Sequence, residues 1–488
     1  MPYYGKISLA CSLCRTRKIK CDQLRPSCSQ CLRISATCTG YRDPKSTVFR
    51  HYSYITEKRK PLPESFESAD SDIEMALKSV TKSHRLDGSL SISTNDLVTS
   101  LFYGYFTVGG SPTGHLFTSW LPKNIPNTDN DASLAAFRAT GYALLFAITK
   151  SQDQLAMARQ KYSKALYLTR QALESPDTSQ TCWIVRIILL LSLFETFACT
   201  SYASLLMVHQ HFAGAAALLR TQDLYNKENP LSKDELQVFL LLRRRLVATS
   251  LMRKMPIATA VIRWSEAVKK IMTPDELWSS ELWDGIAQLA NLQAKLATNQ
   301  PANYANYIQP LEQQDRHLST WANRLPQSWR YEIRSRQFKD EDYPTYYYKY
   351  IDYNVALDWT HYRVARCIIH HTILKFSQTA DVTIPSSILS NQIVNSERII
   401  QSLCDDICAT VPYFLRQTDQ SSSSKPGIDA LDLVWPLHMT VNMDCAPLSQ
   451  RLWAQGKLQE IGETMGISLA SQLAAVLKPA WLQVNANR

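Results

Sequence analysis

Six of the twelve cysteines in this 488-residue chain lie within its first 38 residues, and their spacing repeats. The unit Cys-x2-Cys-x6-Cys occurs twice, through Cys11, Cys14, Cys21, Cys28, Cys31 and Cys38. Three thiolates cannot complete a tetrahedral zinc site, and two separate zinc ions require eight ligands. Six thiolates are enough if two of them bridge both ions. Since iron–sulfur clusters use other spacings, the pattern predicts a binuclear cluster of two Zn²⁺ ions.

The sequence also indicates a compartment in which these cysteines stay reduced. Residues 1–10 lack the apolar run of a secretory signal. The longest apolar run, Ile187 to Phe194, is bounded by Arg186 and Glu195 and is far shorter than the roughly 20 residues of a membrane span. We therefore expect no transmembrane helix and no membrane partner. In a reducing compartment, metal binding is favoured over a disulfide knot or six unrelated buried cysteines.

The positive charge of the chain is concentrated around the cysteine cluster. Residues 1–60 contain 13 Lys and Arg and three acidic residues, so they account for the whole net charge of +10. The remaining residues are balanced in charge. A basic head on a neutral body predicts a head that binds a polyanion, either nucleic acid or an acidic membrane surface.

The 28 residues from Cys11 to Cys38 resemble the fungal Zn(II)2Cys6 binuclear cluster of transcription factors, and Pro26 matches the loop proline of that family. The resemblance implies that Cys11 and Cys28 bridge the two zinc ions. The remaining ligands would be Cys14 and Cys21 for one ion and Cys31 and Cys38 for the other. A module of this size has little apolar volume, so zinc should supply much of its folding free energy.

A basic run in the first unit suggests how the head would contact DNA. Ser12 can cap a short helix that runs from Leu13 to Lys20, and the major groove is wide enough to accept such a helix. Its basic side chains are Arg15, Arg17, Lys18 and Lys20. The resemblance implies that Lys18 contacts the guanines of a CGG-type half-site, and we expect the other three to contact phosphates. The alternative is a solvated surface or a nuclear import signal.

Residues 42–95 have the composition of a flexible linker, polar and partly acidic. Pro61 and Pro63 interrupt any heptad repeat, so a dimerising coiled coil is not predicted and a homodimer formed by the body stays open. Residues 58–60 are basic and either serve nuclear import or are simply solvated. Acidic and hydrophobic residues alternate at 64–77, which is typical of a transactivation segment.

From Asp96 onward the apolar spacing predicts an all-α domain. The expected helices are 155–173, 180–198, 203–220, 234–252, 276–297, 347–376, 386–410, 429–443 and 448–478. Short motifs in this part resemble the fungal-specific transcription factor domain; they are Leu191 to Glu195, His209, His211, Gly214, Ala215, Leu218 and Trp435 to Leu437. The resemblance implies an inhibitory, effector-sensing or dimerising role.

We find no catalytic signature, only near matches. The glycine-rich segment after Gly104 has phosphate-loop spacing but carries Gly110 where a lysine is required. His209 and His211 would lie about 200° apart on a helix and could not share a metal. Cys404 and Cys408 share a helical face without nearby histidines, so we expect buried thiols.

These features predict a mostly α protein with three parts: a Zn2Cys6 DNA-binding domain at 1–41, the linker at 42–95 and an all-α regulatory domain at 96–488. The predicted function is a nuclear regulator of RNA polymerase II transcription that binds double-stranded DNA and the transcription machinery. Its targets would be a pathway gene set, with a secondary-metabolite cluster as first hypothesis and nutrient or stress genes as the alternative. The rival function is a zinc-dependent module that binds protein or RNA. We do not expect an enzyme.

Overall fold

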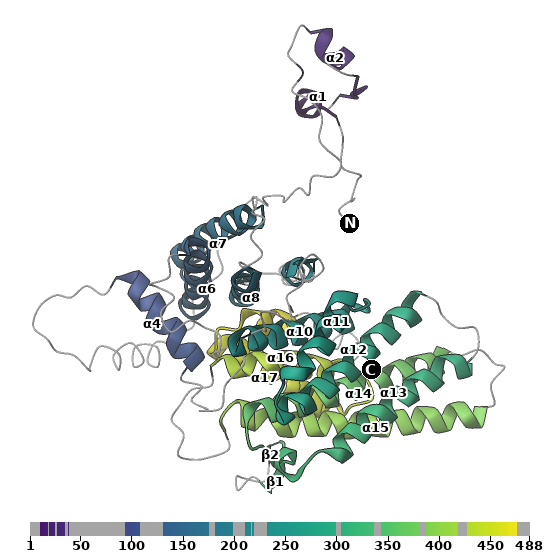
Figure 1. Ribbon diagram of the computed structural model, residues 1–488. Coiled ribbons are helices and arrows are strands. Elements are labelled where there is room, and N and C mark those ends of the chain that lie inside the picture. The colour runs from purple at the N-terminus through teal and green to yellow at the C-terminus, as the bar shows by residue number, and fades with distance from the viewer. Residues whose placement is uncertain are drawn as a thin grey trace, which may run out of the picture. The chain divides into compact units, whose positions relative to one another are not determined.

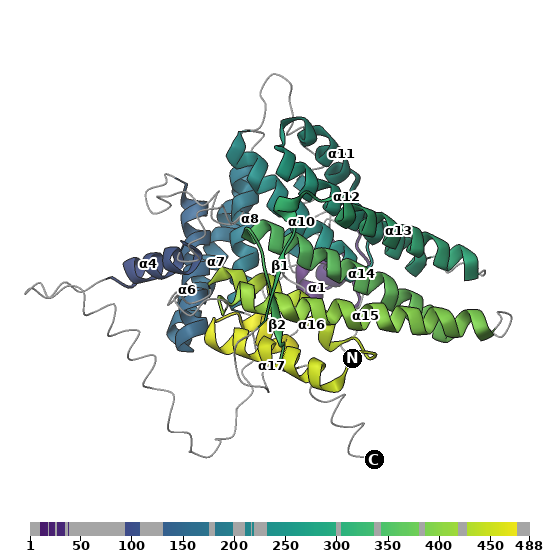
Figure 2. The same ribbon diagram turned by 90° about the horizontal axis from the view of Figure 1, so that it is seen from below.

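The computed structural model forms two compact units, residues 1–89 and residues 90–488 (Figures 1 and 2). It describes residues 10–17, 19–24, 27–34, 38, 93–107, 130–174, 181–198, 210–215, 217–218, 232–298, 304–335, 343–379, 386–417 and 427–475. Almost all of the predicted linker therefore lies outside the described residues, and the predicted domain boundaries stay predictions.

The described part of the second unit, which we call the body, is mostly helical, as predicted. Its helices are α4 (Thr94–Thr107), α6 (Asp131–Thr149), α7 (Gln152–Leu173), α8 (Thr181–Phe197), α10 (Lys233–Arg253), α11 (Thr259–Val268), α12 (Pro274–Thr298), α13 (Tyr304–Arg324), α14 (Tyr353–Thr379), α15 (Ser386–Phe414), α16 (Leu431–Val441) and α17 (Leu448–Thr464). Short 3-10 turns are η3 (Lys269–Ile271), η4 (Gln327–Trp329) and η5 (Ile428–Ala430). The apolar spacing thus located α7, α8, α10 and α12 to within a few residues.

Helix α6 is almost entirely enclosed by its neighbours. It packs against α4, α7 and α8, which gather at one end of the body (Figures 1 and 2). Asn130 caps it by accepting a 2.9 Å hydrogen bond from the Ser133 N–H. Among the described residues it is the one helix long and apolar enough to cross a membrane, but most of it is buried between other helices. Burial between helices accounts for this composition, and the absence of a membrane span stays a prediction.

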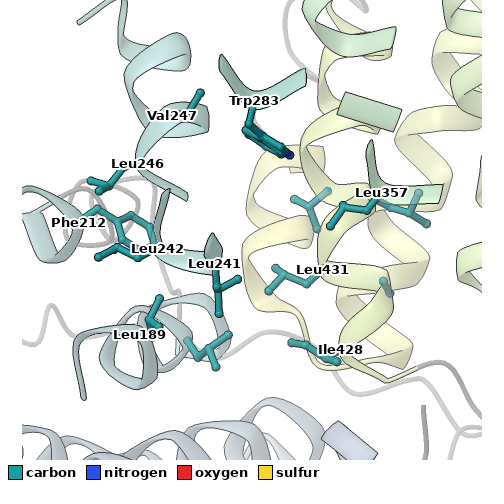
Figure 3. Close-up of a cluster of buried hydrophobic side chains, with 14 of the residues drawn as sticks. Leu189, Phe212, Leu241, Leu242, Leu246, Val247, Trp283, Leu357, Ile428 and Leu431 are labelled. Atoms are coloured by element: carbon teal, nitrogen blue, oxygen red, sulfur yellow. The ribbon is translucent and has the colours of Figure 1, made fainter. Parts of the chain in front are cut away.

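Side chains from five helices meet in one hydrophobic core (Figure 3). They include Leu189 of α8, Leu241 of α10, Trp283 of α12, Leu357 of α14 and Leu431 of α16. Because these helices are far apart in the sequence, the core joins both ends of the body into one unit. Such burial of large apolar side chains stabilises by about 1.5–3 kcal/mol per residue relative to an exposed position.

The prediction of a helix from 347 onward is wrong at its start. Residues Tyr346–Lys349 form strand β2, which pairs antiparallel with β1 (Glu332–Ser335), with Ile333 opposite Tyr348. The tyrosine run favours a pleated strand, and Tyr348 is buried where β2 packs against α15. The body is therefore not strictly all-α.

Two other predicted boundaries are corrected. The helix predicted at 448–478 stops at Thr464, because Gly466 takes a left-handed φ of 71°, and helical structure resumes at 468–475. The helix predicted at 386–410 continues to Phe414. Of the helix predicted at 203–220, only 210–215 and 217–218 are described, and these are helical.

Two glycines provide a test of this packing. A Cβ on Gly427 would overlap the backbone carbonyl oxygen of Tyr105 in α4, so one of the two segments would have to move. We expect Gly427→Ala to destabilise the body by about 1–3 kcal/mol. Gly456 is exposed inside α17, and no described atom lies within 4 Å of a Cβ there. Gly456→Ala should stabilise by about 0.4–1 kcal/mol. Urea unfolding followed by circular dichroism measures the stability of both variants. If the two changed stability equally, the close contact between Gly427 and Tyr105 would be contradicted.

Candidate metal centre and nucleic-acid interface

The cysteine-rich segment folds into two very short helices, α1 (Ser12–Thr16) and α2 (Ser29–Leu32), which contact each other. Helices of five and four residues are not stable alone in water. The buried side chains described in this unit are Ala10, Cys11, Cys14, Cys28 and Cys31. Because Ala10 is the one buried side chain besides cysteines in the described part of this unit, the described part relies on its sulfurs rather than on a hydrophobic core.

The six cysteine sulfurs form two groups of four that have two members in common. One group is Cys11, Cys14, Cys21 and Cys28, and the other is Cys11, Cys28, Cys31 and Cys38. Within each group all sulfurs lie within 4.8 Å of one another. Cys11 and Cys28 belong to both groups, which is the arrangement that two shared ligands require.

The sulfur separations fit tetrahedral zinc. With Zn–S bonds of 2.3 Å, two sulfurs on one tetrahedral ion are about 3.8 Å apart. The Cys11 sulfur lies 3.8 Å from that of Cys28 and 3.7 Å from that of Cys31, and the Cys14 sulfur lies 3.7 Å from that of Cys28. Thiolate ligands and this spacing match what zinc prefers, and the ions would join the two halves of the unit.

Metal binding must displace protons from these thiols. Burial, together with hydrogen bonds to Cys11 and Cys28, raises the pKa of Cys14 to about 12. Burial also raises the pKa of Cys28. Because only thiolates bind zinc, the cations have to replace those protons, so loading of the cluster should release protons and weaken as pH falls.

Helix α1 is shorter than predicted, since it ends at Thr16 and not at Lys20. The Ile19 N–H donates to the Cys14 carbonyl at 3.1 Å, a bond five residues back that closes the helix and directs the chain toward Cys21. Lys20 therefore follows the helix instead of lying on it.

The structure describes the predicted DNA-contacting residues only in part. The side chains of Arg17 and Lys20 are exposed. Lys18 lies outside the described residues, as do the side chains of Arg15 and the predicted cap Ser12. The exposed pair is compatible with phosphate contacts, and the base-reading role of Lys18 stays a prediction.

One structural residue of the head was missed by the sequence reasoning. The carboxylate of Asp22 accepts 3.2 Å hydrogen bonds from the backbone N–H of Ser29 and a further bond from the Ser29 hydroxyl. These bonds tie the loop after Cys21 to the first residue of α2. The sequence did carry a signal for this contact: Asp22 directly follows the ligand Cys21, and Ser29 is the first residue of α2.

Comparison with known proteins identifies this unit. Residues 9–47 match the fungal Zn(2)-Cys(6) binuclear cluster domain. The head of the chain is a Zn(2)-Cys(6) domain. Such a domain holds two zinc ions, which agrees with the prediction and with the two sulfur groups. The family match ends at residue 47, so a fungal-specific regulatory domain in the body stays a prediction.

Three similar proteins are fungal and are matched over short segments. Transcription factor FBD3 of Gibberella moniliformis is 30% identical over 137 residues, 28% of this chain and 16% of that protein. Oleate activated transcription factor 3 of Kluyveromyces lactis is 34% identical over 71 residues, 14% and 11% of the two chains. Sterol uptake control protein 2 of Candida albicans is 29% identical over 86 residues, 17% and 12%. No solved structure matches.

The histidines and cysteines that the sequence analysis considered in the body do not form a second metal site. Among the described residues, the only groups of side chains that could hold a metal ion are the two cysteine groups of the Zn(2)-Cys(6) domain. The His211 Nε2 lies 2.9 Å from the Tyr162 hydroxyl and 3.8 Å from the Glu195 carboxylate, and His209 is outside the described residues. Cys404 and Cys408 are fully buried in α15, as expected of inert thiols.

Proposed function

We propose that this protein is a nuclear, sequence-specific DNA-binding regulator of transcription by RNA polymerase II. The observation that carries the proposal is the pair of four-sulfur groups that share Cys11 and Cys28 within a Zn(2)-Cys(6) domain. The relatives that are named transcription factors support it. Cys11 and Cys28 would be ligands of both ions, and Cys14, Cys21, Cys31 and Cys38 would supply the remaining thiolates.

In this proposal the zinc cluster holds a basic segment against the major groove. Lys18 donates hydrogen bonds to the acceptor atoms of guanine in a CGG-type half-site. Arg15, Arg17 and Lys20 contact phosphates, which add affinity without selecting a sequence. The cluster itself carries a formal charge of about −2, from two Zn²⁺ and six thiolates, and the neighbouring cations offset that field.

A pair of substitutions tests the division between base reading and phosphate contact. Lys18→Ala should cost about 1–3 kcal/mol on a CGG-containing duplex and should relax sequence preference. Arg17→Ala should weaken binding to all duplexes alike and reduce the dependence of affinity on salt. Fluorescence anisotropy with CGG and scrambled duplexes at several salt concentrations measures both. Equal losses of Lys18→Ala on the two duplexes would refute the base-reading role.

The remaining parts of the chain have proposed roles that follow from this one. Residues 42–95 act as the linker, and the body at 96–488 regulates the head and contacts the transcription machinery or a second copy of the chain. The targets form one pathway gene set, a secondary-metabolite cluster in the first instance. Genome-wide binding would give the half-site spacing and the targets together. If the full chain bound RNA or a protein while ignoring CGG duplexes, the alternative of a zinc-dependent interaction module would replace this proposal.

A further inference from the structure

Four arginines line one concave pocket in the body, far in sequence from the Zn(2)-Cys(6) domain. The pocket has a volume of about 440 Å³ and lies where α13, α14 and α15 run side by side (Figures 1 and 2). We call it the arginine pocket, and its arginines are Arg330, Arg363, Arg366 and Arg398. Asp406 is the one acidic residue in its lining, so the lining has a net charge of +3.

Arg363 lies at the floor of the arginine pocket and is 1% exposed. Its Nη1 donates to the Tyr350 hydroxyl at 2.6 Å and to the Thr410 hydroxyl at 3.0 Å, and its Nε is 3.7 Å from the Asp406 carboxylate. Its Nη2 is buried and finds no acceptor among the described residues. A buried charged donor without an acceptor is costly. Because Arg363 lines the pocket, its positive charge would attract an anion there.

The other three arginines of the pocket differ in whether a carboxylate neutralises their positive charge. The charge of Arg366 is neutralised by Asp315, because its guanidinium donates to both carboxylate oxygens at 2.6 and 2.9 Å. Arg330 and Arg398 are exposed and form no ion pair with the described residues. The Arg330 guanidinium donates to the Asn323 carbonyl at 2.9 Å. The lining of the pocket thus combines two exposed arginines, which no described carboxylate neutralises, with the buried Arg363.

We propose that the arginine pocket binds a small anion whose acidic group presents several acceptor oxygens, either a phosphate or a carboxylate. Guanidinium groups bind both in a bidentate manner. The volume is within the range of pockets that hold small molecules, about 300–1,000 Å³. A concave pocket of that size favours a small ligand over duplex DNA, which needs an extended basic surface. Occupation of this site would give the body a means of sensing a metabolite.

Isothermal titration of the full chain with inorganic phosphate and with succinate, each against chloride at equal ionic strength, tests the proposal. We expect the double variant Arg330→Gln/Arg398→Gln to bind the preferred anion at least tenfold more weakly than the unmodified chain. Arg263→Gln provides the matched control, because Arg263 is exposed on α11 and does not line the pocket. It should bind as the unmodified chain does. Circular dichroism verifies that each variant is folded.

The two probes distinguish the source of the oxygens. Tighter binding of phosphate assigns a phosphorylated ligand, and tighter binding of succinate assigns a carboxylic acid. Equal binding by the double variant and the unmodified chain would overturn the proposal, since the anion would then lie elsewhere, for example on the basic head. Absence of binding by either probe at millimolar concentration would overturn it as well.

Discussion

Replacing Cys28 by Ser is expected to abolish DNA binding by the full chain. Cys28 belongs to both four-sulfur groups, so its loss removes a ligand from each zinc ion at once. Structural zinc in small domains is worth about 10–16 kcal/mol of binding free energy, which is also folding free energy. Among the described residues of the head, Ala10 is the one buried side chain besides the cysteines, so we expect the head not to fold without that contribution. We expect at least a hundredfold loss of affinity for a CGG-containing duplex, measured by fluorescence anisotropy.

Cys38→Ser is the matched control for this experiment. Cys38 belongs to one group only, so the ion held by Cys11, Cys14, Cys21 and Cys28 keeps all four ligands. Its loss should weaken DNA binding less than the loss of Cys28 does, and part of the fold of the head should remain. If the two variants lost affinity equally, Cys28 would not be a shared ligand.

Replacing Arg363 by Ala is expected to destabilise the body by about 3–5 kcal/mol. The guanidinium carbon lies 4.7 Å from the centre of the Tyr348 ring, 5.0 Å from that of Tyr331 and 5.5 Å from that of Trp359. Alanine would lose these cation–π contacts and leave a cavity among aromatic rings. It would also remove the hydrogen bonds that Arg363 donates to the buried hydroxyls of Tyr350 and Thr410. The midpoint of urea unfolding of the full chain, followed by circular dichroism, measures the loss.

Two further substitutions show whether the planar shape of the Arg363 side chain or only its charge stabilises the body. Arg363→Lys keeps the charge but not the planar group that stacks between rings, so it should lose most of the same stability. Arg263→Ala removes an exposed arginine of α11 and should change stability by no more than about 0.5 kcal/mol. If Arg363→Ala lost as little stability as Arg263→Ala, the contacts of Arg363 with the rings of Tyr331, Tyr348 and Trp359 would not stabilise the body.

The zinc cluster was predictable because its ligands are close in sequence. The doubled spacing fixed the number of thiolates, and the coordination number of zinc then required two of them to be shared. The end of α1 was not predictable in this way, because it depends on the bond from Ile19 to Cys14 that forms when the chain turns back toward the cluster.

Helices α7 and α6 show one way in which burial decides whether apolar spacing predicts a helix. Helix α7 has one buried and one exposed face, so its apolar residues recur every three or four positions. Helix α6 has 13 buried residues on all sides, which removes that period, so apolar spacing does not predict it. Apolar spacing alone does not predict strand β2: the tyrosine run favours a strand, but the pairing with β1 that completes it is a tertiary contact.

The arginine pocket had no signal in the sequence. Arg330, Arg363 and Arg398 are separated by more than thirty residues each, and only the packing of α13, α14 and α15 brings them to one place. The periodicity of apolar residues and the spacing of a motif predict structure that residues close in sequence form. They do not report which distant side chains will share a cavity.

The number of zinc ions per chain tests the shared cluster most directly. The purified protein can be treated with a thiol-specific oxidant, and the zinc it releases can be measured with a colorimetric chelator against the protein concentration. Two ions per chain are predicted, released together as Cys11, Cys14, Cys21, Cys28, Cys31 and Cys38 react. One ion per chain would contradict the binuclear cluster and with it the proposed DNA-reading head.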